Sequence, residues 1–518
     1  MSAWLWGSRP ISPVAMSDAG ATIPELICKA ENPDRLAFVD GDLRLTFGAF
    51  GALCGQIAAN LSAQGVAAGS RVVLVVPDGA PLAAVLFACA RLGAIAVPLN
   101  WRLSADEIAA NAAVAKPVVV VVSTRFLSLA QGVVAPLLVL PPDPAQALAV
   151  LAGDPAPPPP DAARPFEPWL MLFTSGTTGQ AKGCLLSQAG QVAAAASVAA
   201  ARGAGPDHRL LSTAPLFHVG GLGLLLAHAC VGAATVFAPQ PLSAAQWLDL
   251  LDREGCTSAS LAPTLREDVL RLLEARDPPG RLKCLSGPGT TMIDAAAFRA
   301  LYDRFGERMV VGYGLTEAGN SAAHMSGSEQ LDHLDACGRV LSHLEAKVVD
   351  QSGRSLSAGE VGELCLRGPS VMLGYWEDLD ATAETLKDGW LWTGDLFSLD
   401  ETRRLRFAGR RKDLIKSGGE NVSPAEVERA LLSHPAIADC AVCGVPDPRW
   451  GEAVKAFIVI APGQELTALE AIGWSRKHIA GFKRPRYVEF VEALPRSQLG
   501  KLDRRALAAR PVTDAQAV

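Results

Sequence analysis

Short apolar runs alternate with helix-like segments through the first part of the chain. Residues 72–76, 94–99 and 118–122 are runs of strand length that carry no charged side chain. Residues 80–92 form an apolar, alanine-rich stretch of helix length that stops at Gly93. Strands that alternate with helices predict a parallel sheet whose faces are covered by helices.

Polar residues mark where several of these elements begin. Residues 40–47 contain an Asp-Gly-Asp turn signal beside apolar positions, which predicts a hairpin. Ser104 with Glu107, and Ser243 with Gln246, have the spacing of capping boxes that open helices. The alternation therefore continues well beyond the first strands.

Two segments have compositions that need their own interpretation. Residues 141–160 are rich in proline, and we expect them to form a surface connection. Residues 219–237 are uncharged and long enough to cross a membrane. Because they contain His228 and four glycines, a buried helix and strand of a large core is favoured, and no integral membrane segment is expected.

The character of the chain changes at Gly409. Residues 410–413 are a charged run that indicates a hinge, and beyond it Ser423, Pro424 and Glu426 form the pattern of a capped helix start. The rest has the size of a small α+β domain. The predicted division is a disordered N-terminus over residues 1–20, a large α/β domain over 21–409 and a smaller domain over 410–518.

Composition excludes some classes of function. With 518 residues the chain is long enough for two or more domains. Its 47 basic and 53 acidic side chains give a net charge of -6, which offers no case for a nucleic-acid partner.

The cysteines and the N-terminal residues give an indication of the cellular compartment. The chain has 11 cysteines, of which only Cys440 and Cys443 are closely spaced, and an odd separation on a strand puts their thiols on opposite faces. Reduced cysteines are therefore favoured over a redox or zinc pair, and we expect a cytoplasmic protein. Residues 1–15 lack the apolar core of a signal peptide, and Met16 is an alternative start.

The segment with the clearest chemistry is residues 174–183, Thr-Ser-Gly-Thr-Thr-Gly-Gln-Ala-Lys-Gly, which follows an apolar run of strand length. Its glycines allow backbone N–H groups to turn toward one anion, while hydroxyls and Lys182 supply further donors and a positive charge. A Walker A loop has a glycine directly before its lysine and a serine or threonine directly after it. Here Gly179 stands three residues before Lys182, and Gly183 follows the lysine, so a Walker A loop is excluded. The segment predicts a phosphate cradle, with a flexible surface loop as the alternative.

Two glycine-marked strand ends follow the cradle in sequence. Residues 285–290 and 310–317 each run from apolar residues into a loop that contains glycine. In open parallel sheets, ligands bind beyond the carboxyl ends of the strands. Both loops are therefore expected to meet the cradle.

Six motifs follow one another in a fixed order, at residues 174–183, 215–218, 313–317, 390–395, 409–416 and 495–501. Together they resemble the motif set of the acyl-adenylate-forming superfamily, which includes acyl-CoA and aryl-CoA synthetases. The match extends over nearly the whole chain beyond about residue 35.

The resemblance implies a fold, a reaction and co-substrates. The expected fold is a large N-terminal domain of parallel sheets flanked by helices, with a β-rich subdomain and a small mobile C-terminal α+β domain. The expected reaction joins a carboxylate to ATP as acyl-AMP with release of pyrophosphate, after which the thiol of coenzyme A displaces AMP. ATP, Mg²⁺ and coenzyme A are implied, and a homodimer is left open.

The resemblance also assigns roles in the first step. Glu317 would bind Mg²⁺ with Thr177 or Thr178, Tyr313 would lie against adenine, and Asp395 with Arg410 would hold the ribose. The implied catalytic residues are Lys182, Thr178, Glu317 and Lys501. The implied ATP and AMP contacts are Thr174, Ser175, Gly176, Thr177, Thr178, Gly179, Lys182, Gly287, Pro288, Tyr313, Gly314, Thr316, Asp395, Arg410 and Lys501.

Plainer interpretations stay open for several of these residues. Lys501 lies in a basic tail where it could be merely solvated, Asp395 could be a turn residue, and Glu317 could cap a helix. His218, implied as a gate beside the acyl group, could be structural, and Trp450 could be an ordinary packed residue.

The second step and the acid involve further residues. Lys412 would be the hinge, and the implied coenzyme A tunnel is lined by Gly418, Gly419, Glu420 and Trp450. The acyl pocket is expected to be lined by His218, Gly220, Gly221, Leu222, Val311, Gly312, Asn320 and Ser321. Since residues 217–222 offer no aspartate for an ammonium group, an apolar aryl, alicyclic or fatty acid is expected rather than an amino acid.

The sequence departs from the family pattern at some positions, and two alternative functions stay open. Ala181, Gln188 and residues 286–289 differ from the usual motifs, and the last of these leaves the shape of the acyl site open. One alternative is a stand-alone adenylating enzyme that loads a phosphopantetheinyl carrier protein. Another is a non-catalytic nucleotide-binding protein, which is disfavoured because Glu317 and Lys501 are both present.

Overall fold

The fold is known from a computed structural model of the chain. The residues it describes are 20–28, 32–174, 181–287, 289, 295–417, 420–447, 449–496 and 502–511. The predicted disorder of the N-terminus concerns residues that, apart from residue 20, lie outside this set.

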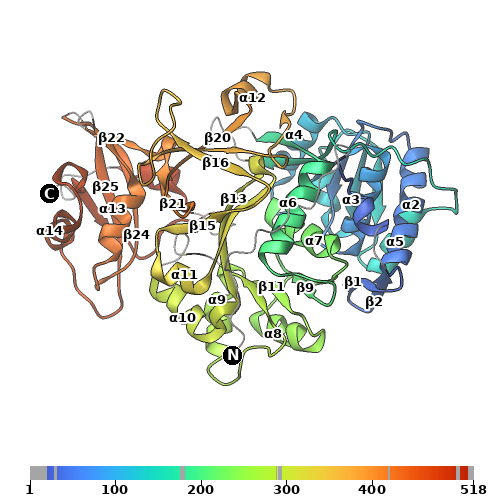
Figure 1. The fold of residues 1–518 in the computed structure, drawn as a ribbon, viewed down its shortest axis with the longest axis horizontal. Helices are drawn as coiled ribbons and strands as arrows, with labels where there is room; N and C mark the ends of the chain where they lie inside the picture. The colour runs from blue at the N-terminus through green and yellow to red at the C-terminus, as the bar shows by residue number, and fades with distance from the viewer. Residues whose placement is uncertain are drawn as a thin grey trace.

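A seven-stranded sheet forms one end of the molecule (Figure 1). In spatial order its strands are β18 (Gly374–Tyr375), β8 (Lys182–Ser187), β7 (Pro168–Thr174), β4 (Ile95–Pro98), β3 (Arg71–Val75), β5 (Val119–Ser123) and β6 (Leu137–Leu140). Strands β4, β3, β5 and β6 are parallel, as the alternation of strands and helices predicts. Helices α2 (Phe47–Ala63), α3 (Ala80–Leu92) and α5 (Pro144–Ala152) share a core with one face, and α4 (Ala105–Ala115) packs on the other.

Helix α5 corrects the expectation that residues 141–160 are only a surface connection. Asp143 caps the helix by accepting a hydrogen bond from the Gln146 backbone N–H at 2.9 Å, and Pro144 occupies the first helical position, where proline is tolerated. Leu148 and Leu151 are buried in the core beside the sheet.

A fourteen-stranded sheet runs through the middle of the molecule. In spatial order its strands are β16 (Glu345–Val349), β17 (Gly362–Arg367), β20 (Trp390–Leu399), β21 (Arg404–Arg410), β15 (Ala336–Val340), β14 (Asn320–Ser326), β13 (Met309–Leu315), β12 (Cys284–Ser286), β11 (Ser258–Ser260), β9 (Arg209–Ser212), β10 (Ala234–Phe237), β1 (Leu36–Asp40) and β2 (Leu43–Thr46), with β19 (Leu386–Lys387) beside β20. The pairs from β1 to β13 are parallel, whereas those from β13 to β16 are antiparallel. The predicted β-rich part is thus continuous with the parallel part, and the predicted hairpin is β1–β2.

Helices cover both faces of this sheet. Helices α8 (Ala244–Arg253) and α10 (Ala295–Phe305) bury Trp247 and Phe298 against one face. Helices α6 (Gln188–Ala201) and α7 (Val219–Cys230) lie between the two sheets (Figure 1). The apolar segment 219–237 is therefore α7 followed by β10, and among the described residues no helix is long and apolar enough to cross a membrane. The shorter helices are α1 (Glu25–Cys28), α9 (Arg266–Leu272), α11 (Gly327–Asp332) and α12 (Leu379–Thr385).

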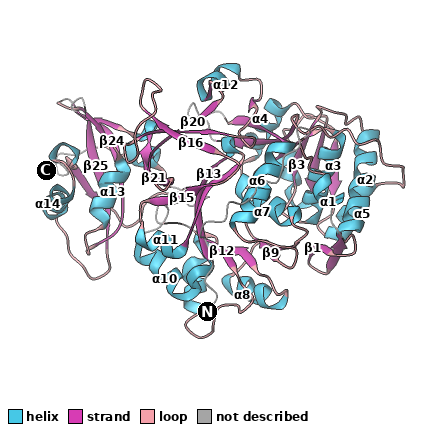
Figure 2. Cartoon of the chain, viewed as in Figure 1, coloured by secondary structure: helices cyan, strands magenta, loops and turns pink. Residues whose placement is uncertain are grey.

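A third sheet of five strands forms the opposite end of the molecule (Figure 2). Its strands are β23 (Glu420–Val422), β22 (Ile415–Ser417), β25 (Gly451–Ile460) and β24 (Ile437–Asp447), with β26 (Tyr487–Phe490) beside β25. Helices α13 (Pro424–Leu432) and α14 (Ala468–His478) pack on one face and α15 (Arg504–Ala508) on the other. Cys440 and Cys443 are buried in the separate cores of these two faces, as their odd spacing predicted.

The expected capping box at the start of α13 does not form. Helix α13 begins at Pro424, but the Ser423 hydroxyl donates to the backbone carbonyl of Ala408. Glu426 instead accepts two hydrogen bonds from the Lys483 ammonium at 2.7 and 2.8 Å. Contacts between distant segments thus replace the local cap.

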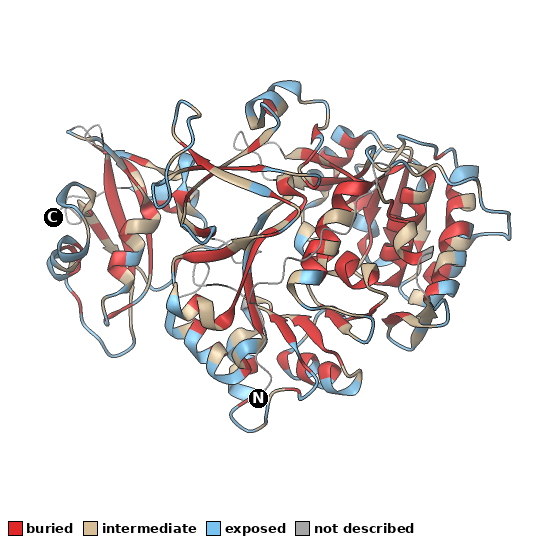
Figure 3. Ribbon diagram, in the orientation of Figure 1, coloured by how far each residue is buried: buried red, intermediate tan, exposed pale blue. Residues whose placement is uncertain are grey.

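Burial follows the layered arrangement. The strands and the inward sides of the helices are buried, while the outer helix faces are exposed (Figure 3). The carboxyl ends of β7 and β13 carry the predicted phosphate and nucleotide motifs, so the fold positions the candidate site where the first two sheets meet.

Candidate active site

The predicted phosphate cradle joins two antiparallel strands. Strand β7 ends at Thr174 and β8 begins at Lys182, and these two residues are register partners. The Lys182 ammonium lies 3.9 Å from the Asp378 carboxylate and 5.2 Å from the centre of the Tyr375 ring. Ser175, Gly176, Thr177, Thr178 and Gly179 lie outside the described residues.

Glu317 lies in the turn that follows β13. Gly314 belongs to that strand, Thr316 begins the short 3₁₀ helix Thr316–Ala318, and Gly319 closes the turn with φ of 81°. The Glu317 backbone carbonyl accepts a hydrogen bond from the Met372 N–H at 2.9 Å, and its carboxylate accepts one from the Tyr375 hydroxyl at 2.8 Å.

Tyr375 connects the two charged groups that the sequence predicted. Its hydroxyl bonds Glu317 while its ring lies beneath the Lys182 ammonium. Burial and the charge of Glu317 raise the pKa of Tyr375, so the hydroxyl keeps its proton and acts as the donor. The pairing of β18 with β8 places Tyr375 beside the lysine, although the two are far apart in sequence.

Tyr375 and Asp378 are site residues that sequence reasoning missed. Both lie in the segment that leads into α12, where the Asp378 side chain accepts a hydrogen bond from the Ala381 N–H at 3.0 Å. The glycine and two aromatic residues at 374–376 are the local signal that could have drawn attention to this segment.

Asp395 forms a second polar centre with Tyr313 and Arg410. The Tyr313 hydroxyl donates to Asp395 at 2.7 Å, and the Arg410 Nε lies 3.2 Å from the other carboxylate oxygen. Asp395 and Arg410 are register partners on β20 and β21, which explains how they meet. Burial raises the pKa of Asp395, and this effect is opposed by Arg410 and by the hydrogen bond from Tyr313.

Tyr313 is held on two sides. Its ring lies 4.8 Å from that of Phe397 in an edge-to-face arrangement, and its hydroxyl is used by Asp395. Burial and the Asp395 charge raise the pKa of Tyr313, so it is a donor at neutral pH. The carboxylate of Asp395 retains lone pairs for further donors.

The predicted acyl-pocket residues occupy different environments. His218 precedes α7, and its ring lies 5.0 Å from that of Phe217. Gly220 is exposed with open space around it, whereas a side chain at Gly221 would meet the Pro215 carbonyl at 2.3 Å. Leu222 is fully buried in the core shared with α3, so its side chain has no surface to offer a substrate.

The strand side of this region is similarly mixed. Gly312 exposes its backbone, and Val311 beside it is buried in the core of the central sheet. Asn320 is 3% exposed and packs against Gly223 of α7, while its side chain accepts a hydrogen bond from the Ser321 N–H at 2.7 Å. Of the predicted lining, Gly220 and Gly312 are exposed, and His218 and Ser321 are partly exposed.

The adenine-side loop is described only in part. Gly287 follows β12 and donates its N–H to the Val310 carbonyl at 3.2 Å. Pro288 lies outside the described residues.

Residues predicted for the thioester step lie at the third sheet. Trp450 is partly buried, and the guanidinium groups of Arg449 and Arg486 lie 4.9 and 4.6 Å from its ring. Glu420 is exposed at the start of β23, and Lys412 lies in the 3₁₀ turn Arg411–Asp413 between the second and third sheets. Gly418, Gly419 and Lys501 lie outside the described residues.

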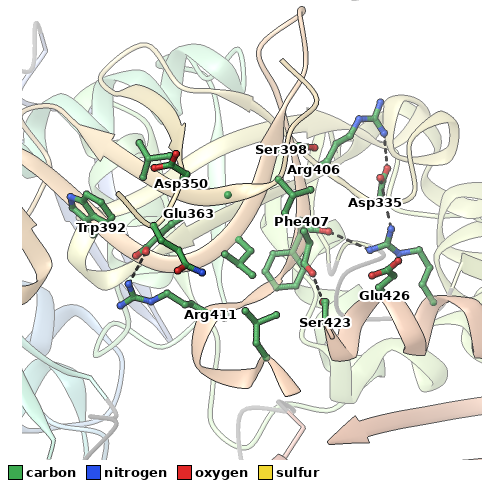
Figure 4. A pocket seen from close by; sticks show the side chains of 18 of the residues that line it. Asp335, Asp350, Glu363, Trp392, Ser398, Arg406, Phe407, Arg411, Ser423 and Glu426 are labelled. Atoms are coloured by element: carbon green, nitrogen blue, oxygen red, sulfur yellow. Dashed lines mark hydrogen bonds and ion pairs between the residues drawn. The ribbon is translucent and has the colours of Figure 1, made fainter. Parts of the chain in front are cut away.

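A pocket of about 920 Å³ lies beside β20, with Trp392 and Ser398 of that strand in its lining (Figure 4). Leu396 and Ser398 face it, whereas Asp395 and Phe397 face Tyr313. Arg411 pairs with Glu363 at 2.9 Å along its wall. None of the predicted site residues that the structure describes lines this pocket, so it is a space between the central sheet and α13 rather than the predicted nucleotide site.

Comparisons with known proteins identify the family. Residues 28–376 match the AMP-binding enzyme family, and residues 426–501 match the AMP-binding enzyme C-terminal domain. The chain therefore belongs to the AMP-binding enzymes, as the motifs predicted.

Individual relatives agree with this assignment. The chain is 36% identical to an indoleacetate–CoA ligase of Aromatoleum aromaticum, covering 92% of this chain and 96% of the relative. It is 35% identical to a fatty acid–[acyl-carrier-protein] ligase of Streptomyces coeruleorubidus over 87% of this chain and 89% of the relative. The structure of o-succinylbenzoate CoA synthetase from Bacillus subtilis with its acyl-adenylate intermediate superposes with a TM-score of 0.81 at 27% identity, covering 94% of this chain and 98% of that one.

The family defines the reaction class. The chain is an AMP-forming acid–thiol ligase that binds ATP and AMP and acts on small-molecule acids. The predicted mixed α/β fold, with a large N-terminal and a smaller C-terminal domain, is that of solved members of the family.

Proposed function

We propose that this chain activates an aryl or alicyclic carboxylic acid with ATP and transfers the acyl group to coenzyme A. A carboxylate oxygen attacks the α-phosphorus, the bond to pyrophosphate breaks, and acyl-AMP forms. The coenzyme A thiol then gives its proton to solvent and attacks the acyl carbon, the bond between that carbon and the AMP oxygen breaks, and AMP leaves. Because both reactants of the first step are anions, the site must neutralise charge and hold them in line.

The observation that carries this proposal is the contact of Tyr375 with both Lys182 and Glu317. A cation for phosphate oxygens lies 5.2 Å from the centre of the Tyr375 ring, and a carboxylate for a metal ion accepts a hydrogen bond from the Tyr375 hydroxyl at 2.8 Å. Lys182 would hold the β- and γ-phosphates together with Ser175, Thr177, Thr178 and Gly179. This arrangement supports ATP chemistry at the carboxyl ends of β7 and β13.

The residues present fit one magnesium ion held with the nucleotide. Among the described residues no group of three or more His, Cys, Asp or Glu side chains could hold a metal by itself. Mg²⁺ in ATP-dependent enzymes is bound by one or two carboxylates and by substrate phosphates, and Glu317 with Thr177 would supply the protein ligands. When bound, the ion neutralises phosphate charge.

Asp395 and Arg410 are proposed to hold the ribose, and Lys501 to reach the reacting α-phosphate from the C-terminal domain. The free lone pairs of Asp395, with Arg410 and Tyr313 fixing its orientation, support this assignment. For the second step we propose that the small domain rotates about Lys412 so that coenzyme A passes Gly418, Gly419, Glu420 and Trp450.

The acid is proposed from the open part of the acyl region and from the relatives. Gly220, two residues after His218, has open space around it, and the relatives named for indoleacetate and o-succinylbenzoate act on aryl acids. The fatty acid–carrier-protein relative supports a second candidate, in which a phosphopantetheinyl carrier replaces coenzyme A.

The test is ATP-dependent AMP release with a panel of aryl, alicyclic and fatty acids, each with coenzyme A, with a loaded carrier protein, or with neither. The proposal predicts AMP and a coenzyme A thioester with one aryl or alicyclic class. Acyl-AMP that forms but is consumed only by the carrier protein would overturn the assignment of the acceptor.

A further inference from the structure

Arg202, at the end of α6, has no carboxylate partner among the described residues. Arg202 follows the last residue of the helix, and its guanidinium donates to the Cys284 sulfur at 3.3 Å and to the Ser286 hydroxyl. Its Nε is buried without a hydrogen-bond partner, and no salt bridge among the described residues includes Arg202. A partly buried cation is usually paired with an acid, because neutral partners do not compensate its charge.

Two buried histidines lie near enough to this guanidinium for its charge to act on them. His228 of α7 and His324 of β14 are 1% and 5% exposed, and each has one buried ring nitrogen without a partner. Burial lowers the pKa of His228 to about 4 and that of His324 to about 3, and the nearby Arg202 charge adds to both effects. Both rings are therefore neutral at pH 7, and neither compensates the charge of Arg202.

The cluster adjoins the wall of the proposed acyl site. Ser286, which accepts from Arg202, directly precedes Gly287 and is the register partner of Val310 on β13. Two residues further along that strand, about 7 Å, lies the exposed Gly312, which pairs with His324. The His324 ring lies against this glycine, because a side chain there would meet its Cδ2 atom at 2.6 Å.

These contacts carry one assignment, which rests on the proposed function. We propose that Arg202 receives a second anionic group of the substrate, so that the acid bears a carboxylate or sulfonate remote from the carboxylate that is activated. Arg202 is then a specificity-determining residue, and the neutral His324 is a further hydrogen-bonding group at the same wall. A purely structural role is the competing explanation, since a cation is favourable at a helix carboxyl terminus.

Binding of matched acids separates the two explanations. Calorimetric titrations would compare benzoate with terephthalate and phenylacetate with 4-carboxyphenylacetate. In the matched control each diacid carries a methyl ester on its ring 4-carboxylate, so that only the remote group is uncharged. The variants are Arg202→Met, Arg202→Lys and the control Arg276→Met, which removes an arginine that pairs with Asp249 and Asp252 at the surface.

We expect the second carboxylate to tighten binding by about 10- to 100-fold in at least one pair, as for a hydrogen bond between charged groups. Arg202→Met should abolish that preference while leaving the monoacid and the ester within about threefold, and Arg202→Lys should restore part of it. Equal affinities for mono- and diacids in every pair would overturn the proposal, as would a preference that survives Arg202→Met.

Turnover is measured separately so that failure of the proposed function can be recognised. A diacid preference in binding that depends on Arg202, but without any acid-dependent AMP release, would contradict the proposed function and uphold this site. AMP release from monoacids alone, with no effect of Arg202→Met on any acid, would uphold the proposed function and refute this site.

Discussion

Replacing Tyr375 with phenylalanine tests whether one hydroxyl positions the proposed magnesium ligand. The variant keeps the ring, and with it the packing and the contact with the Lys182 ammonium 5.2 Å away. It removes only the hydroxyl that donates to Glu317 at 2.8 Å. Glu317 would then be free to rotate away from the position that a metal ion needs.

The expected size follows from the bond that is lost. Hydrogen bonds to charged groups contribute about 1.5 to 3 kcal/mol, and partial exposure of both side chains favours the lower part of that range. A loss of about 1.5 to 2 kcal/mol corresponds to roughly a 10- to 30-fold change in an equilibrium constant. We therefore expect the Mg²⁺ concentration that gives half-maximal activity to rise by this factor.

The assay has one catalytic and one binding readout. Pyrophosphate exchange is titrated with Mg²⁺, and binding of a fluorescent ATP analogue is titrated with Mg²⁺ in the absence of acid. Tyr302→Phe is the matched control, because the Tyr302 hydroxyl donates to Glu307 at 2.6 Å in an exposed position. The reasoning is refuted if Tyr375→Phe leaves both magnesium midpoints unchanged, or if activity falls equally at every magnesium concentration together with the melting temperature.

Three further changes probe other parts of the molecule. Asp395→Asn should weaken AMP binding by about 10- to 100-fold, because it removes a charged acceptor, and calorimetry that finds an unchanged Kd would contradict this. Burial lowers the pKa of His228 from 6.5 to about 4, so the unfolded chain binds a proton that the native state resists. The free energy of unfolding is therefore highest above pH 6.5 and falls toward pH 4 by about 1.4 kcal/mol per pH unit. Urea titrations at several pH values should show that the free energy of unfolding depends less on pH in His228→Gln. Trp450→Ala should slow thioester formation at least about tenfold and leave acyl-AMP formation intact, whereas the control Trp474→Ala, on the outer helix α14, should change neither.

Local signals predicted local structure well. The alanine-rich run ending at Gly93 forms α3 (Ala80–Leu92) with the residue bounds that were predicted, and the boxes at Ser104 and Ser243 form as expected. These features depend on backbone groups within a few residues, which the sequence displays directly.

Contacts between distant segments could not be predicted in this way. Ser423 leaves its own helix to bond Ala408, and Tyr375 reaches Glu317, 58 residues away in sequence. Both contacts depend on how strands pair, and the pairing of β18 with β8 has no short-range signature. The motifs therefore predicted the family, while the groups that orient the candidate site residues required the fold.

The central claim is that the acid is activated by attack of its own carboxylate on the α-phosphorus of ATP. It is tested most directly by supplying the acid with both carboxylate oxygens labelled as ¹⁸O and analysing the products by mass spectrometry. The account predicts that AMP carries one labelled oxygen, that pyrophosphate carries none, and that the remaining label is in the coenzyme A thioester. Unlabelled AMP, or release of ADP and phosphate instead of AMP and pyrophosphate, would contradict it.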